Sequence, residues 1–154
     1  MNQDEIQKLT DRLRRLCSRR EYCVSDVRKK AMTALEGDSE AAENVVSALV
    51  AEKYVDDLRY ATAYAREKAM ISGWGETKIR YMLSGKRIPR DIVSQAMTEI
   101  DEGKADVRLQ KLLENKMRSL KDDPQIKLKL IRFALGRGYQ YDDIAPVIDS
   151  LLRS

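Results

Sequence analysis

Residues 54–97 read YVDDLRYATAYAREKAMISGWGETKIRYMLSGKRIPRDIVSQAM, the densest pattern in a chain of 154 residues. Ala61, Ala65 and Ala69 recur on one side of a helix, and neighbouring tyrosines widen that apolar side. The glycines on either side of Trp74 interrupt the pattern. Pro89 suits the first turn of a further helix because it needs no backbone N–H partner. The stretch therefore predicts three consecutive helices joined by short turns.

The segments on either side repeat this layout. Moving residues 79–97 forward by 52 positions superimposes Ile79 on Ile131 and Arg80 on Arg132, and moving the first third forward by 48 superimposes Leu35 on Leu83. Units of roughly 50 residues are too small to bury their own apolar faces, so neighbouring units must stack. We therefore predict an all-α fold, an elongated, curved stack of three tandem three-helix repeats. One domain spans residues 1–154, with repeats at about 4–53, 54–102 and 105–153.

The phase of the apolar residues predicts which helix faces are buried. In the middle helices of the second and third repeats, we expect one buried side made by the pairs Ile79/Leu83 and Ile131/Leu135. Tyr81 and Phe133 lie on nearly the opposite side and are expected to pack in a second direction. Val50 is expected to be buried in the third helix. Arg80 and Arg132 then occupy equivalent, exposed positions between the packed faces.

The residues that enzymes use for acid–base chemistry are sparse. The chain has no histidine, so Cys17 and Cys23 have neither a general base nor a zinc site of the usual type, and we interpret them as packing residues. Three aspartate pairs begin predicted helices, where carboxylates accept hydrogen bonds from backbone N–H groups. They are Asp56/Asp57, Asp122/Asp123 and Asp142/Asp143. We predict no enzyme and no catalytic, cofactor-binding or metal-binding residues.

Charge distribution suggests a binding surface. The formal net charge is +4, and basic residues gather at the middle helix of each repeat, whereas acidic residues gather on the closing helices. Such a pattern favours a polyanion or an acidic surface as the partner. The residues that we expect to bind a partner protein or DNA are Arg28, Lys29, Lys78, Arg80, Lys86, Arg87, Lys127, Lys129 and Arg132.

Hydropathy gives no membrane segment. No apolar run reaches the roughly 18 to 20 residues that a membrane span needs, and MNQDEIQK does not resemble a signal peptide. We therefore predict a cytoplasmic protein without a membrane partner. We also expect a monomer, although nothing in the sequence specifies the oligomeric state.

Residues 54–97 resemble the central repeat of the RecX family, bacterial regulators of the RecA recombinase. In that family an aspartate pair precedes a helix and a glycine precedes an I-R-x-x-L helix, here YVDD and GWGETKIRYML. The resemblance extends more weakly over nearly the whole chain. It departs from the family at Lys53, where a glycine is usual, and at Cys23 and Val24, where the first repeat often has a serine.

The resemblance implies a regulator that lodges in the helical groove of the RecA filament on single-stranded DNA. Such a protein mainly inhibits ATP hydrolysis, strand exchange and filament growth, and belongs to DNA repair by homologous recombination and to the SOS response. Single- and double-stranded DNA are further implied partners.

Two alternatives remain open at the level of sequence. A stand-alone helical DNA-binding protein acting without RecA would bind DNA tightly by itself, with an affinity that falls steeply as salt rises. An enzyme built on an aspartate pair would bind a divalent metal.

Overall fold

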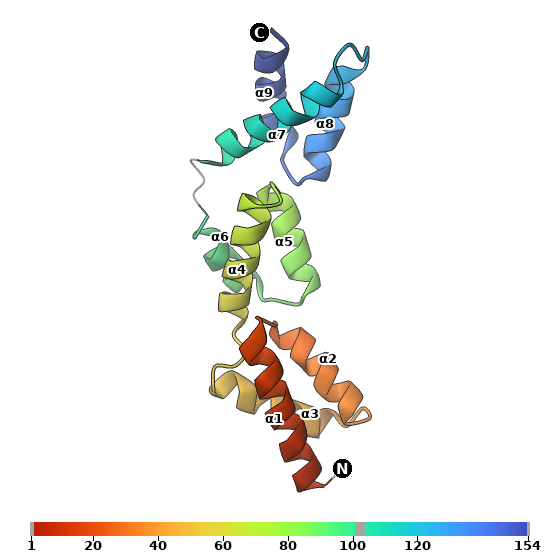
Figure 1. Ribbon diagram of the computed structural model, residues 1–154. Helices are drawn as coiled ribbons and strands as arrows, with labels where there is room; N and C mark the ends of the chain where they lie inside the picture. Colours follow the sequence, from red (N-terminus) through yellow and green to blue (C-terminus); the bar gives the residue numbers. More distant parts are fainter. Residues whose placement is uncertain (1, 101–103, 154) are drawn as a thin grey trace. The chain divides into compact units, whose positions relative to one another are not determined.

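The computed structural model describes residues 2–100 and 104–153, and within these ranges the chain forms nine helices and no strand (Figure 1). The all-α, tandem three-helix organisation is therefore confirmed, whereas the last residues of the second predicted repeat, 101 and 102, lie outside the described residues. In chain order the helices are α1 (Gln3–Arg19), α2 (Val24–Ala34), α3 (Ser39–Ala51), α4 (Asp57–Met70), α5 (Glu76–Gly85), α6 (Arg90–Met97), α7 (Ala105–Ser119), α8 (Ile126–Gly136) and α9 (Tyr141–Arg153).

Acidic side chains begin several of these helices, as the sequence predicts. The Asp38 carboxylate accepts from the backbone N–H of Ala41, 3.1 Å away, at the start of α3. Asp56 accepts from the N–H of Arg59 at 2.9 Å, at the start of α4. Each bond satisfies one of the N–H groups that a helix N-terminus leaves without an internal partner.

Asp57 has a different role from its neighbour. Its carboxylate accepts from the backbone N–H of Val24 at 2.8 Å, so it caps α2 rather than its own helix. Burial of this carboxyl raises the pKa of Asp57, in spite of the hydrogen bond from Val24. Asp57 thus joins the starts of α2 and α4, through a hydrogen bond between residues that are 33 positions apart in the sequence.

The first compact unit contains residues Met1–Ala63 and Leu83–Ala96. Helices α1, α2 and α3 pack against one another (Figure 1), and their shared core includes Leu13, Ala31 and Leu49. Cys17 and Cys23 are buried and unbridged in this unit, and burial raises the pKa of both thiols. These cysteines are packing residues, since a protonated, buried thiol is a poor nucleophile.

The second compact unit contains residues Tyr64–Met82 and Met97–Ser154. Helices α7, α8 and α9 pack around Leu113, Leu130 and Ile148 (Figure 1). Pro146 lies inside α9, five residues after its first residue and beyond the turn whose backbone N–H groups have no helical partner, so its missing N–H removes one internal hydrogen bond of α9. Aliphatic residues of all three helices supply most of this core.

Burial corrects the expected register between the second and third repeats. In α8 the buried residues are Leu130 and Ala134, whereas Leu135, expected to be buried, is 47% exposed. A shift of 51 residues superimposes buried positions on one another, namely Ile79 on Leu130, Leu83 on Ala134 and Val93 on Ile144. The identities found at a shift of 52 are therefore one residue out of register, and Arg80 and Arg132 are not equivalent positions. The shift of 48 from the first repeat agrees with burial, because Leu35 and Leu83 are both buried.

Two further expectations about packing were wrong. Tyr81, expected to pack in a second direction, is 77% exposed, and Val50 is 43% exposed. Both lie beside residues that already fill the buried face, and a helix in a three-helix repeat needs only one such face.

Candidate functional site

The sequence-predicted basic residues lie on α2, on α5 and the turn after it, and on α8. In the first unit the structure brings two of these segments together. The hydroxyl of Ser25 donates to the carbonyl oxygen of Lys86 at 2.7 Å, and the Lys86 ammonium lies 3.0 Å from the Asp26 carboxylate. Arg28 and Lys29, one turn further along α2, therefore share a surface region with the α5–α6 turn.

Most of the predicted binding residues already have an acidic partner. The pairs are Arg28–Glu43, Arg80–Glu76, Lys86–Asp26, Lys127–Asp149 and Lys129–Asp123. The Arg80 pair follows the four-residue spacing of a helix, and the Lys129 pair is also local, with partners that are six positions apart. The pairs of Arg28, Lys86 and Lys127 join residues of different helices or turns and depend on tertiary structure. Exposed pairs of this kind contribute little to stability, so their cations can exchange a carboxylate for a phosphate. Within residues 2–100 and 104–153, Lys29, Arg87 and Arg132 have no ion pair.

Ion pairing shifts the pKa of both partners: the hydrogen bond with Asp26 raises the pKa of Lys86, and the hydrogen bond with Glu43 raises the pKa of Arg28. Burial alone would raise the pKa of Asp26, but hydrogen bonds from the Lys86 ammonium and from Cys23 bring it below its ordinary value. Hydrogen bonding to the Arg28 guanidinium likewise lowers the pKa of Glu43. Both carboxylates therefore stay ionised and neutralise part of the basic surface at neutral pH.

Lys78 belongs to an aromatic cluster rather than to an open basic face. Its ammonium lies 4.2 Å from the centre of the Trp74 ring, and that of Lys68 lies 4.9 Å from the same ring. Lys78 also donates to the carbonyl oxygen of Gly136 at 3.3 Å. These contacts hold the cation near its own fold, so Lys78 has a structural role beyond the one that its charge suggested.

The α4–α5 turn and the α8–α9 turn form a close junction within the second unit. The N–H of Gly75 donates to the carbonyl oxygen of Arg137 at 2.7 Å, and the N–H of Thr77 donates to that of Gly138 at 3.2 Å. A Cβ on Gly75 would lie 2.4 Å from the Gly138 carbonyl oxygen. By sequence alone, the glycines on either side of Trp74 only interrupt a helical pattern. Their recurrence as G-W-G and G-R-G was visible in the sequence, but the pairing of the two turns was not.

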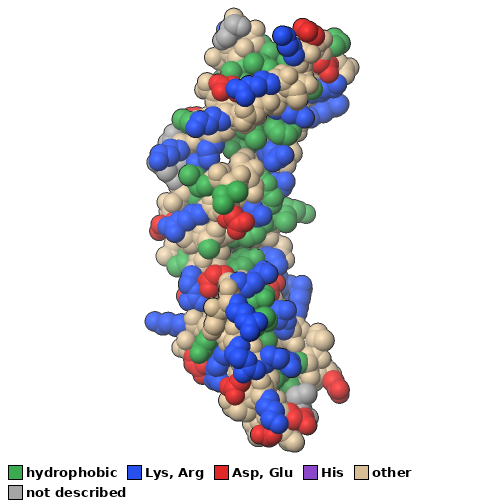
Figure 2. Space-filling model, in the orientation of Figure 1, with side chains coloured by type: hydrophobic (Ala, Val, Ile, Leu, Met, Phe, Trp, Pro, Cys, Tyr) green, Lys and Arg blue, Asp and Glu red, His purple; other side chains and the backbone are tan. Residues whose placement is uncertain are grey.

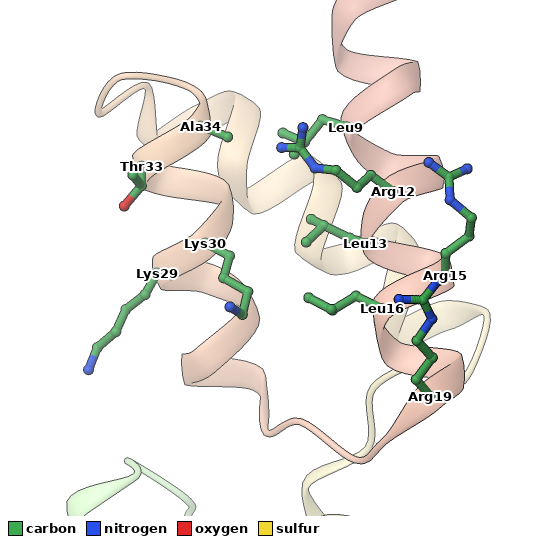
Figure 3. A pocket seen from close by; sticks show the side chains of 10 residues that line it. All are labelled: Leu9, Arg12, Leu13, Arg15, Leu16, Arg19, Lys29, Lys30, Thr33 and Ala34. Carbon is green, nitrogen blue, oxygen red and sulfur yellow. The ribbon is translucent and has the colours of Figure 1, made fainter.

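A groove of about 660 Å³ lies between α1 and α2 in the first unit (Figure 3). Three arginines that sequence reasoning left out of the binding residues line it, Arg12, Arg15 and Arg19. Their spacing of three and four residues on a helix was the signal that could have found them. Figure 2 shows Lys and Arg side chains gathered over the N-terminal helices on the face in view.

A metal site and a membrane-spanning helix were also considered for the described part of the chain. There, no group of three or more Cys, Asp or Glu residues is placed to hold a metal ion. Among the same residues, no helix combines the length and apolar character required to cross a membrane.

Comparison with known proteins identifies the family. Residues 56–97 match the family model described as RecX, second three-helix domain, and residues 106–148 match RecX, third three-helix domain. The regulatory protein RecX of Vibrio parahaemolyticus is 35% identical over 133 residues, which cover 84% of this chain and 83% of that protein. The regulatory protein RecX of Clostridium tetani is 31% identical over 121 residues, or 76% of this chain and 55% of the relative. The chain thus spans about half the length of this clostridial relative.

Solved structures share the fold. The crystal structure of RecX from Lactobacillus salivarius superimposes with a TM-score of 0.82 at 22% identity, over 98% of this chain and 99% of that one. A second crystal structure of a regulatory protein RecX gives a TM-score of 0.84 at 22% identity, over 95% of this chain and 72% of that one. With two matching three-helix domains and a relative that is 35% identical over most of both chains, this chain belongs to the RecX family of regulatory proteins.

Proposed function

We propose that this chain binds the RecA filament on single-stranded DNA and lowers its ATP hydrolysis, strand exchange and growth. The observation that carries the proposal is membership of a family whose curated relatives are named as RecX regulatory proteins. A regulator of this kind acts by binding, which is consistent with a helical repeat fold that presents charged surfaces. The proposal places the chain in homologous recombination.

Exposed cations without an internal partner are the best candidates for contact with the filament. Among the sequence-predicted binding residues, Lys29, Arg87 and Arg132 meet this condition in the described part of the chain, and each can pair with a phosphate or a carboxylate of the filament. The paired residues, such as Arg28, can join only after they exchange their acidic partner.

The alternative function is DNA binding without RecA. The observation that favours it is the accumulation of basic residues around α2 and the α5–α6 turn in one unit. A net charge of only +4 argues against it, because dedicated DNA-binding domains have a stronger basic excess.

Fluorescence anisotropy of the labelled chain separates the two functions. Titration with RecA filaments and with bare single-stranded DNA is expected to give tight binding to the filament only. The double variant Arg87→Glu/Arg132→Glu is expected to weaken filament binding about tenfold. The control Arg118→Glu/Lys121→Glu makes the same change in charge on and after α7 and should bind as the wild type does. Equal affinity for bare DNA and filament, with a steep salt dependence, would instead support the alternative.

A further inference from the structure

The groove between α1 and α2 combines an apolar floor with a rim of one charge. Leu9, Leu13 and Leu16 extend from α1 toward α2 (Figure 3), and Ala34 lines the same groove from α2. Leu9 and Leu13 also belong to the core of the three helices, whereas Leu16 is only half-buried. The floor is therefore a patch of aliphatic surface continuous with the core.

Every charged side chain that lines the groove is positive. Arg12, Arg15 and Arg19 follow α1, and Lys29 and Lys30 stand on α2 (Figure 3). All five are exposed. Within the described residues, the three arginines have no ion pair, unlike Arg14 on the neighbouring face of α1, which pairs with Asp11 and Glu52. The rim is thus an uncompensated double row of cations.

This arrangement costs stability in the unbound protein. Like charges spaced three or four residues apart on a helix repel each other, as Arg12 and Arg15, or Arg15 and Arg19, do here. An anionic partner in the groove removes that repulsion. Because the cations stand on both sides of the floor, the partner must be negative along both of its edges.

The floor selects the class of partner. Single-stranded nucleic acid binds such sites by phosphate contacts together with stacking of bases on aromatic side chains, and no aromatic residue lines this groove. A nucleic-acid duplex would meet the cations with its phosphates but would leave the aliphatic floor without an apolar partner. An amphipathic helix instead inserts aliphatic side chains spaced by three and four residues into an apolar groove. Acidic residues on both flanks of such a helix would face the arginines on one side and the lysines on the other.

We propose that the groove between α1 and α2 binds an acidic amphipathic helix of a partner protein. The part of α1 from Leu9 to Arg19 is about 15 Å long, so three turns of a partner helix, about 11 to 12 residues, fill the groove. This proposal does not rest on RecA being a partner of the chain. Of the residues assigned above to filament contact, only Lys29 lines the groove.

A designed peptide tests the proposal directly. The probe is a fluorescein-labelled helical peptide of about 12 residues, with Leu spaced by three and four residues on one face and Glu on both flanks. Two matched peptides replace either every Leu with Ala or every Glu with Gln. A labelled oligothymidylate of about 16 nucleotides serves as the nucleic-acid probe. Anisotropy measures binding to the full chain.

The peptide with both Leu and Glu is expected to bind saturably, and each matched peptide about tenfold more weakly or worse. The variant Arg12→Gln/Arg15→Gln/Arg19→Gln should weaken binding of the full peptide about tenfold. The control Lys111→Gln/Arg118→Gln/Lys121→Gln, with the same loss of charge around α7, should leave it unchanged. Amide chemical-shift changes at Leu16 and Thr33 locate the bound peptide without relying on a variant's stability.

Three results would overturn the proposal. The Ala peptide could bind as tightly as the Leu peptide, which would leave the floor without a role. The oligonucleotide could bind through the same arginines while the peptide does not, which would make the groove a nucleic-acid site. The full peptide could also fail to perturb Leu16 and Thr33 at concentrations of about 1 mM, where even weak binding is detected.

Discussion

Replacing Gly75 by alanine should separate the two turns that meet in the second unit. The added Cβ would lie 2.4 Å from the Gly138 carbonyl oxygen and 2.8 Å from the Tyr139 nitrogen. Both contacts involve backbone atoms, which cannot rotate away as the end of a side chain can. Either the turns move apart or the backbone remains strained.

The size of the effect follows from the contacts at this junction. Separation loses the hydrogen bonds from Gly75 to Arg137 and from Thr77 to Gly138. Each is worth about 0.5 to 1.5 kcal/mol. Retaining them would instead leave a steric conflict of about 1 to 3 kcal/mol. In either case we expect Gly75→Ala to lower the free energy of unfolding by about 1 to 3 kcal/mol and the Tm by roughly 2 to 12 °C.

Gly136, two residues before Gly138, provides the matched control. A Cβ there meets nothing within 4 Å. Gly136 ends α8 with an ordinary helical backbone, so Gly136→Ala should stabilise the protein by about 0.4 to 1 kcal/mol through the unfolded chain. Thermal unfolding followed by far-ultraviolet circular dichroism measures both variants. The reasoning is refuted if Gly75→Ala melts at or above the wild-type temperature.

Three further predictions concern the first unit and the third repeat. The pKa of Asp26 lies below its ordinary value of 3.8, so the ionised carboxylate stabilises the fold above that pH. In urea unfolding, the wild type should therefore have a higher free energy of unfolding than Asp26→Asn at neutral pH. This difference should vanish as the pH falls through the lowered pKa of Asp26. Equal stabilities at pH 7 would contradict this. Asp57→Ala should lose the cap of α2 and about 1 kcal/mol, whereas Asp57→Asn keeps an acceptor. Because burial raises the pKa of Asp57, the neutral variant Asp57→Asn should be more stable than the wild type at pH values above that pKa. At low pH, where the wild-type carboxyl is protonated, this difference should disappear. Deleting residues from 105 onward removes the partner turn of Gly75, so the remaining fragment should aggregate or melt earlier in differential scanning calorimetry. An unchanged melting temperature would show that the repeats are independent.

The sequence was sufficient for the elements of the fold, because helix punctuation is local. Asp56 caps α4 and Pro89 precedes α6 as predicted, since each acts within one turn of its own position. The register between the second and third repeats was predicted wrongly. The matching Ile79 and Ile131 suggested a shift of 52 residues, whereas packing selects Leu130. Identity of residue type does not specify which side of a helix the neighbouring elements cover.

The candidate site was predictable only in part, for a related reason. The density of cations on α2 and α5 is a property of composition, and the structure confirms that these residues lie at the surface. Arg80 has a local partner in Glu76, but other partners come from tertiary structure, as with Lys86 and Asp26, which are 60 residues apart. The Gly75–Gly138 junction was hidden for the same reason, because a glycine needed for close approach looks the same in sequence as one that ends a helix.

The most direct test of the proposed function is RecA ATPase activity on single-stranded DNA, with this protein added at sub-stoichiometric amounts. A regulator of the filament should lower the rate although most RecA subunits have no bound copy, and Arg87→Glu/Arg132→Glu, folded by its melting curve, should inhibit less. An ATPase rate that stays unchanged even at equimolar amounts would contradict the proposal that this chain regulates the RecA filament.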